Sequence, residues 1–177
     1  SLMAIDRERE AICSASDQVW DNPETAFLEY KSMEILCDLL AKEGFEVKQN
    51  VANIPTAFTG TYGSGKPVIG FLGEFDALSG ISQVAGCVEK KPLVEGANGH
   101  GCGHNHLGTV SAGAGILLSK IVGEIGGKVV IGGTPAEETC GGKVTFANNG
   151  AFDDIDVALI SHPYDKDEES GTSLALN

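Results

Sequence analysis

The sequence has little positive charge: 12 Lys and Arg residues stand against 25 Asp and Glu residues, which gives the 177-residue chain a net charge of −13. Proteins that bind nucleic acid need a surplus of basic side chains for the phosphates, so nucleic acid is disfavoured as a partner. The same shortage disfavours docking on an anionic membrane. The sequence also lacks an apolar run of the roughly 18 residues that cross a bilayer. We therefore expect no nucleic-acid or membrane partner and no signal peptide.

Several common motifs are missing as well. The five cysteines include no C-x-x-C pair and are odd in number, which disfavours a disulfide framework and a closed structural zinc site and favours a reducing, cytoplasmic compartment. No G-x-S-x-G nucleophile motif occurs. Residues 60–66 match G-x-x-x-x-G-K, but Pro67 replaces the Ser or Thr that would bind magnesium. A P-loop is therefore excluded.

The hydrophobic pattern predicts an α/β fold. Strands and helices alternate along the chain, which is typical of a three-layer α/β/α sandwich with a mostly parallel central sheet. The strand over 68–75 is apolar on both faces and is therefore expected to be central, and 157–160 is expected to be another central strand. We predict helices over 5–20, 29–43, 107–122 and 144–149, strands over 45–48, 57–62, 68–75, 128–131, 157–160 and from 173, and a long loop over 78–99.

Four groups of polar residues follow predicted strands or precede a predicted helix. Ligands of such sheets bind at the carboxyl ends of the strands. Together the groups contain all four histidines, a cysteine between glycines and two adjacent carboxylates, which are the ligand types of zinc and its transition-metal neighbours. The groups are Gly73-Glu74-Phe75-Asp76, residues 99–106, Pro135-Ala136-Glu137-Glu138 and Ser161-His162-Pro163.

Cys102 and His104 are the first candidate ligands. They are two residues apart, so an extended loop would point both side chains the same way. The loop leads into a predicted helix, whose positive N-terminal end should favour the Cys102 thiolate. Alone, the pair fits a buried free cysteine beside a capping histidine better, and His162 alone fits a hydrogen-bonded core histidine equally well. The presence of all four groups shifts the interpretation to metal ligation.

Glu137 and Glu138 are adjacent and must point in different directions. This suits one carboxylate that binds metal and a neighbour that takes a proton from water, although alone the pair would be interpreted as solvated. Asp76 is suited to orienting a ligand histidine. His100 and His106 are weaker candidates that could simply hydrogen-bond the loop.

These four groups, in this order, resemble the motifs of the M20 metallopeptidase family. The similar segments are 73–78, 99–105, 133–138 and His162-Pro163, so the resemblance covers essentially the whole chain. The strings GHGCGHN and GTPAEE are most similar to the amidohydrolase branch of the family, which includes aminobenzoyl-glutamate hydrolase-like, dipeptidase-like and aminoacylase-like enzymes.

The resemblance implies a zinc-peptidase-like fold with two divalent metal ions, zinc or manganese. It implies four metal ligands, with the cysteine in the bridging position: Cys102, His104, Glu138 and His162. Glu137 is implied as the general base that takes a proton from the attacking water and passes it to the leaving amine. Asp76, in the family's acidic strand-end motif, is the second catalytic residue implied.

The resemblance further implies that residues 3–177 are the N-terminal part of the catalytic domain and that the first two residues are an expression scar. The family's later histidine ligand has no counterpart after His162, and its lid and dimerisation domain is absent from this sequence. Arg7 and Arg9, the two arginines, lie in the first helix and not at a clamp for the substrate carboxylate. We expect weak or no activity from this chain, and a homodimer for the whole protein.

The expected function is that of a metal-dependent amidohydrolase or peptidase. Its substrate class is a small amide: an N-acyl amino acid, an aminobenzoyl-glutamate-like compound or a dipeptide. Two alternatives stay open. The chain could be a non-catalytic module that binds metal or a partner, or a thiol hydrolase that uses Cys102 as its nucleophile.

Overall fold

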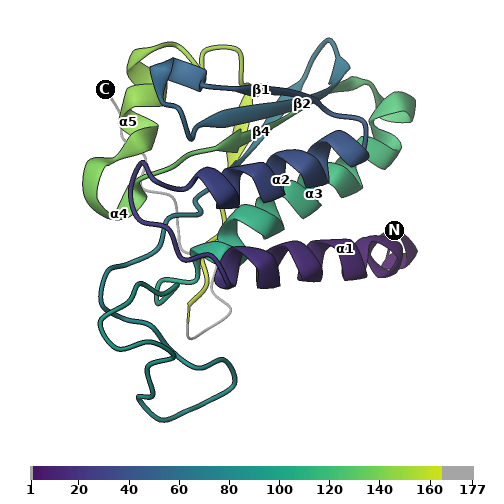
Figure 1. Cartoon of the computed structure of the whole chain (residues 1–177). Helices are drawn as coiled ribbons and strands as arrows, with labels where there is room; N and C mark the ends of the chain where they lie inside the picture. Colours follow the sequence, from purple (N-terminus) through teal and green to yellow (C-terminus); the bar gives the residue numbers. More distant parts are fainter. Residues whose placement is uncertain (1, 165–177) are drawn as a thin grey trace.

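The computed structural model describes residues 2–164, which form an α/β fold around one five-stranded sheet (Figure 1). The expected fold class is confirmed, and the predicted helices and strands are present with shifted bounds, whereas the strand predicted from 173 lies outside the described residues. The elements are α1 (Leu2–Trp20), α2 (Tyr30–Lys42), β1 (Glu46–Gln49), η1 (Val51–Asn53), β2 (Phe58–Ser64), β3 (Val68–Gly73), α3 (His104–Ile125), β4 (Gly127–Gly133), α4 (Glu137–Cys140), α5 (Gly142–Asn148) and β5 (Val157–Leu159).

Four of the five strands run in the same direction. The strand order is β1-β2-β4-β3-β5, in which β3 pairs in parallel with β4 and β5, whereas β2 is antiparallel to β1 and β4. The sheet is therefore mixed, with a parallel half made of β4, β3 and β5. Because the carboxyl ends of parallel strands meet at one edge, this half can bring distant polar segments together.

Three helices cover one face of the sheet. α2 and α3 lie against the strands, and α1 packs on these two helices (Figure 1). Leu36, Leu40, Ile116 and Ile131 are almost completely buried in the core between them. Each such side chain contributes about 1.5–3 kcal/mol through removal of apolar surface from water.

The opposite face is met by the segment around α5. Residues of a strand point to alternate faces. Gly73 of β3 faces α3, where an added Cβ would touch Ser111, whereas Gly70 faces the other way and an added Cβ would touch Ile155. Phe146 of α5 is fully buried in a second, smaller core that includes residues of η1. The segment between α5 and β5 therefore covers part of this second face, and α5 packs on η1.

The prediction that 157–160 forms a central, buried strand is wrong within the described part of the chain. β5 pairs with β3 at the edge of the sheet, and the side chains of Val157, Leu159 and Ile160 are 48%, 47% and 55% exposed. The apolar run indicates a strand that can be covered on both faces, but burial depends on neighbouring segments that the run itself does not specify.

α3 begins earlier than predicted, inside the motif: His104 is helical and Cys102 lies in a turn, so the extended loop expected there is not formed. Gly103 has a φ of 77°, the left-handed conformation that favours glycine, and an added Cβ would touch Pro163. His104 is thus the first residue of the helix. By length and composition α3 could cross a membrane, but half of that window is buried and the helix packs on β3 and β4, as core helices do.

The predicted long loop over residues 78–99 is confirmed. It extends away from the sheet at the bottom of Figure 1. Two backbone hydrogen bonds join its ends: the Leu78 N–H donates to the Gly99 carbonyl (3.0 Å) and the Gly99 N–H donates to the Leu78 carbonyl (2.9 Å). The chain therefore leaves and re-enters the fold at one place.

The contact between α3 and the end of β3 predicts opposite effects for two glycine substitutions in the same helix. A Cβ on Gly108 would lie 3.0 Å from the backbone oxygen of Glu74 and 3.1 Å from Leu36 Cδ1. Gly108→Ala should lower the free energy of unfolding by about 1–3 kcal/mol, the usual cost of overpacking. The control is Gly123→Ala, at an exposed position with no atom within 4 Å, which should raise it by up to about 1 kcal/mol. Urea denaturation measures both, and shifts of the same sign would contradict the packing argument.

Candidate metal centre

The side chains predicted to form the site lie together at one end of the sheet. They come from the segments after β3, β4 and β5 and from the start of α3. Ligand atoms lie within 4.8 Å of one another in two groups that share one histidine. The first group contains Cys102, His104 and His162, and the second contains Glu74, His104 and Glu137.

His104 is the centre of this cluster and is fully buried. Its Nδ1 lies 3.0 Å from Asp76 Oδ1 and 3.0 Å from the Asp76 carbonyl oxygen, so Nδ1–H donates to Asp76. Burial alone would lower the pKa of His104, but the hydrogen bond to Asp76 and the nearby carboxylates raise it. Burial alone would raise the pKa of Asp76, but the bond from His104 lowers it. Asp76 therefore holds His104 with Nε2 turned to the other side.

Glu137 and Glu138 both face His104 Nε2 but differ in exposure. Glu138 Oε1 lies 3.7 Å from that nitrogen and its side chain is 17% exposed, whereas Glu137 Oε2 lies 3.9 Å away and its side chain is 42% exposed. The adjacent carboxylates are thus divided into an inner group and one that water can reach.

Cys102 and His162 approach each other across the end of the sheet. Cys102 Sγ lies 3.4 Å from His162 Nε2, and His162 Nδ1–H donates to the Pro163 carbonyl oxygen at 2.8 Å. The imidazole of His162 therefore has Nε2 on the side of Cys102. The expected helix-dipole stabilisation of the thiolate does not decide the pKa of Cys102: burial, followed by the hydrogen bond and charge of Glu138, raises that pKa to about 11. Burial and the carboxylates around the sulfur therefore disfavour the thiolate in the metal-free chain.

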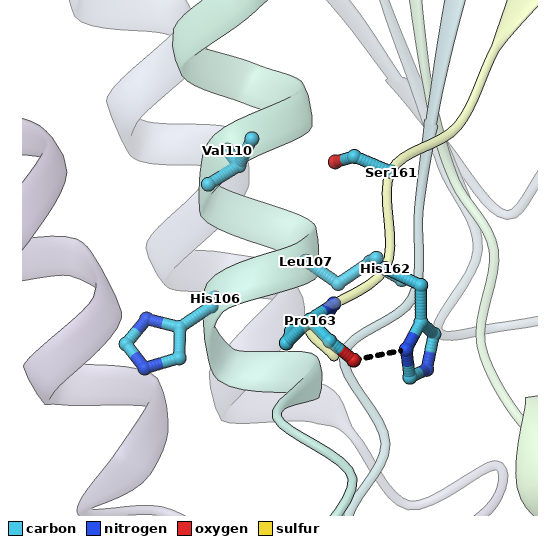
Figure 2. A pocket seen from close by; sticks show the side chains of 6 residues that line it. All are labelled: His106, Leu107, Val110, Ser161, His162 and Pro163. Atoms are coloured by element: carbon cyan, nitrogen blue, oxygen red, sulfur yellow. Dashed lines mark hydrogen bonds between the residues drawn. The ribbon is translucent and has the colours of Figure 1, made fainter. Parts of the chain in front are cut away.

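His100 and His106 lie outside the cluster. His100 Nε2 is 3.1 Å from the Val19 carbonyl oxygen of α1, and burial lowers the pKa of His100 to about 4, so its neutral ring donates to that oxygen. His106 points away from His162 (Figure 2), and its Nδ1 lies 3.2 Å from Ser16 Oγ of α1. Both histidines fasten the cysteine-containing segment to α1.

A cavity of about 330 Å³ opens beside the cluster, between α3 and the segment after β5 (Figure 2). Its walls are largely apolar. The lining residues are His106, Leu107, Val110, Ser161, His162 and Pro163.

The turn that carries the two adjacent glutamates is held by two buried carboxylates. Ala136 has a φ of 59°, a left-handed conformation that costs a non-glycine residue roughly 1–2 kcal/mol. Its N–H donates to Glu29 Oε1 (2.9 Å), and the N–H of Glu138 donates to Asp76 Oδ2 (3.0 Å). Glu29 is fully buried at the start of α2. Its role was not predicted, because 107 residues separate it from Ala136.

Glu74 and Lys143 are two further residues whose place in the site was not predicted individually. Glu74 Oε2 lies 3.3 Å from His104 Nε2, and Glu74 Oε1 is hydrogen-bonded to the Lys143 ammonium. Glu74 belongs to the predicted strand-end motif, so its position after β3 was a usable signal. The sequence contains no comparable signal for Lys143, because a lysine near the start of a helix is usually an ordinary surface residue.

The cluster suits a divalent cation. Among the described residues, His104 Nε2 and Glu138 Oε1 are buried and have no hydrogen-bond partner, although they lie 3.7 Å from each other. Two atoms that each bind one zinc ion at about 2.0–2.2 Å can be this far apart. Imidazole, thiolate and carboxylate are the ligand types that zinc and its neighbours take. The residues present therefore fit a metal site.

The chain is similar to known hydrolases over most of its length. No family model matches it. It is 48% identical over 162 residues to a p-aminobenzoyl-glutamate hydrolase chain of Escherichia coli K12, a match that covers 90% of this chain and 34% of the relative. It is 31% identical over 184 residues to human Xaa-Arg dipeptidase, a match that covers 92% of this chain and 38% of the relative. The chain thus spans about a third of the length of these curated relatives.

Solved structures show the same fold. The Bacillus subtilis YxeP protein, a dinuclear metal-binding peptidase from the M20 family, matches with a TM-score of 0.69 at 23% identity. The match covers 85% of this chain and 42% of that chain.

The contact between Glu29 and Ala136 predicts that Glu29→Ala is strongly destabilising and Glu29→Gln much less so. Alanine removes the acceptor of a buried N–H, with an expected loss of about 1.5–3 kcal/mol in the free energy of unfolding, whereas glutamine keeps an acceptor oxygen in place. Denaturant titration of both variants measures the difference. Equal losses would show that the charge or volume of Glu29 matters and not this hydrogen bond.

The pairing of His104 with Asp76 predicts a pH dependence for the metal-free chain. Because the folded-state pKa of His104 is raised, its stabilising contribution is complete below about pH 6.5 and is lost as the pH rises through the folded-state pKa. Asp76→Asn should lower the pKa of His104 and flatten this part of the stability curve. NMR titration of the His104 ring proton, together with unfolding between pH 5 and pH 9, tests it. An unchanged His104 pKa would contradict the proposed coupling.

Proposed function

We propose that the chain belongs to the M20 metallopeptidase family and that the protein of which it forms part is a metal-dependent amidohydrolase. The proposed substrate is a small amide of an amino acid: an N-acyl amino acid, an aminobenzoyl-glutamate-like compound or a dipeptide. Its relatives are named for p-aminobenzoyl-glutamate and for Xaa-Arg dipeptides, both of which contain such an amide. The cavity of about 330 Å³ beside His162 is within the usual size of a small-molecule pocket.

The observation that carries this proposal is the pair of buried, unpartnered atoms within residues 2–164. His104 Nε2 and Glu138 Oε1 face each other without hydrogen bonds, in a cluster where Asp76 already takes Nδ1 of the same imidazole. Leaving such atoms unpaired costs about 1–3 kcal/mol each, so a fold that retains them requires another partner. A divalent cation satisfies both at once.

The proposed ligands would hold two divalent ions, zinc or manganese. They are Cys102, His104, Glu138 and His162. When bound, such ions lower the pKa of a water molecule and polarise the amide carbonyl. The thiol of Cys102 favours zinc, and the surrounding carboxylates are compatible with manganese. Asp76 keeps His104 in the tautomer that presents Nε2 to the ion.

Glu137 is the proposed general base. Its carboxylate is close to the cluster yet 42% exposed, so a water molecule can reach it. It takes the proton of the attacking water and later delivers that proton to the amine that leaves, and the products are a carboxylate and an amine. The strained turn at Ala136, fastened through Glu29 and Asp76, fixes the direction of this side chain.

We also propose the domain content, the oligomeric state and the location of the whole protein. The chain corresponds to the N-terminal part of the catalytic domain, and a lid and dimerisation domain completes the active site and makes the protein a homodimer. A cytoplasmic location agrees with the five cysteines, all free in the structure.

The alternative of a thiol hydrolase is less favoured, because the pKa of Cys102 is raised to about 11 and not lowered as a nucleophile requires.

Metal content is the first test of this proposal. The purified chain, dialysed against zinc or manganese, should retain about one to two ions per chain by plasma mass spectrometry, and Cys102→Ser should reduce this number. Binding should weaken as the pH falls, because the pKa of His104 is raised and protonation of its Nε2 competes with the ion. The exposed Cys13 provides the matched control, since Cys13→Ser should change nothing. A wild-type chain that retains no ion would contradict the proposed site.

The role of Glu137 separates a hydrolase from a binding module. In the whole protein, Glu137→Gln should reduce hydrolysis of N-acyl amino acids, p-aminobenzoyl-glutamate and dipeptides by about 10²–10⁴-fold, the usual contribution of a general base, while metal content stays unchanged. We expect this chain by itself to hydrolyse these compounds weakly or not at all. Glu137→Gln with wild-type turnover would rule out this residue as the base.

A further inference from the structure

His104 belongs to two candidate ligand groups that cannot both use it. One group joins it to Cys102 and His162, and the other joins it to Glu74 and Glu137. Nδ1 of His104 is engaged by Asp76, so a single nitrogen, Nε2, is available to both groups. An imidazole nitrogen has one lone pair and can coordinate one ion. Some other feature of the site must therefore decide which group receives Nε2.

The contact that decides which group receives His104 Nε2 is the one between Glu74 and Lys143. Its side chain is only 5% exposed, and Oε2 lies 3.3 Å from His104 Nε2, closer than either Glu137 or Glu138. By distance alone Glu74 would be the first carboxylate to share an ion with His104. However, Oε1 of the same carboxylate is bound by the ammonium of Lys143, the one lysine or arginine that pairs with an acid of this cluster in the described residues.

Lys143 is built into the fold and is not a loose surface lysine. It is the second residue of α5, and its side chain is 27% exposed. The preceding Gly142 packs so closely on Pro135 that an added Cβ would collide with the Pro135 carbonyl. The start of α5 is therefore fixed against the turn that carries Glu137, and the ammonium is fixed on Glu74.

We propose that Lys143 is a positioning residue that neutralises Glu74 and so reserves His104 Nε2 for the group containing Cys102 and His162. This inference rests on the proposed metal site. Lys143 acts through Glu74, which keeps one oxygen beside His104 but does not compete as an anionic ligand. Since the first group contains a thiol and the second contains two carboxylates, Lys143 also sets the preference among metals. A thiolate-imidazole group favours zinc or cobalt, and a carboxylate-rich group favours manganese.

The test uses cobalt, whose bond to a thiolate gives a charge-transfer absorption in the near ultraviolet. One equivalent of Co²⁺ added to the wild-type chain should give this band, and Lys143→Arg should keep it. In Lys143→Met, Glu74 is free to take part, so the band should weaken and the affinity for Mn²⁺, measured by titration calorimetry, should rise about tenfold or more, as for other changes beside metal ligands. The double variant Glu74→Gln, Lys143→Met removes the competing charge and should restore both wild-type values.

Each other outcome overturns the inference. A wild-type band and Mn²⁺ affinity in Lys143→Met would show that Lys143 does not control Glu74. A band lost in both Lys143→Met and the double variant would show that Lys143 merely supports the fold, and circular dichroism of both variants would report that loss. A wild-type chain that binds Co²⁺ without the thiolate band would refute this inference and the ligand role of Cys102, while leaving the other ligands standing. A wild-type chain that binds no divalent ion would refute the proposed metal site itself, and with it this inference.

Discussion

The hydrogen bond between His104 and Asp76 is the contact on which the rest of the site depends. It joins the start of α3 to the segment after β3 and takes one nitrogen of the imidazole. The other nitrogen is thereby aimed at Glu74, Glu137 and Glu138 in a buried space. The second oxygen of Asp76 fixes the backbone of Glu138. One carboxylate thus sets the direction of a histidine and the position of the acids it faces.

The site concentrates negative charge that the fold does not balance by itself. Among the described residues, four carboxylates and a thiol surround His104, and Lys143 is the cation paired with them. Such an arrangement is costly in a folded protein unless a cation is bound, because buried like charges repel one another at short distance. Function and stability are therefore in tension at this end of the sheet, and the strained backbone at Ala136 adds to that cost.

Much of the fold and of the candidate site could be predicted from the sequence, because patterns among neighbouring residues indicate them. The period of apolar residues indicated α2 and β3, and the strand-end positions of Asp76, Glu138 and His162 indicated one end of the sheet, where all three lie beside His104. Contacts between distant segments could not be predicted in this way. Glu29 lies 107 residues from its partner Ala136, and Lys143 lies 69 residues from Glu74. The edge position of β5 and the early start of α3 depend likewise on neighbours that no local pattern names.

The closed base of the loop over residues 78–99 has a consequence for how such a protein can change over evolutionary time. The two hydrogen bonds between Leu78 and Gly99 hold the ends of the loop together, between the acids after β3 and the cysteine before α3. Lengthening a surface loop whose ends are already closed costs little free energy. The tip can therefore gain, lose or exchange residues while the ligands on either side stay in register. The sequence of the loop tip can therefore diverge between related proteins while the ligand residues at the site stay the same.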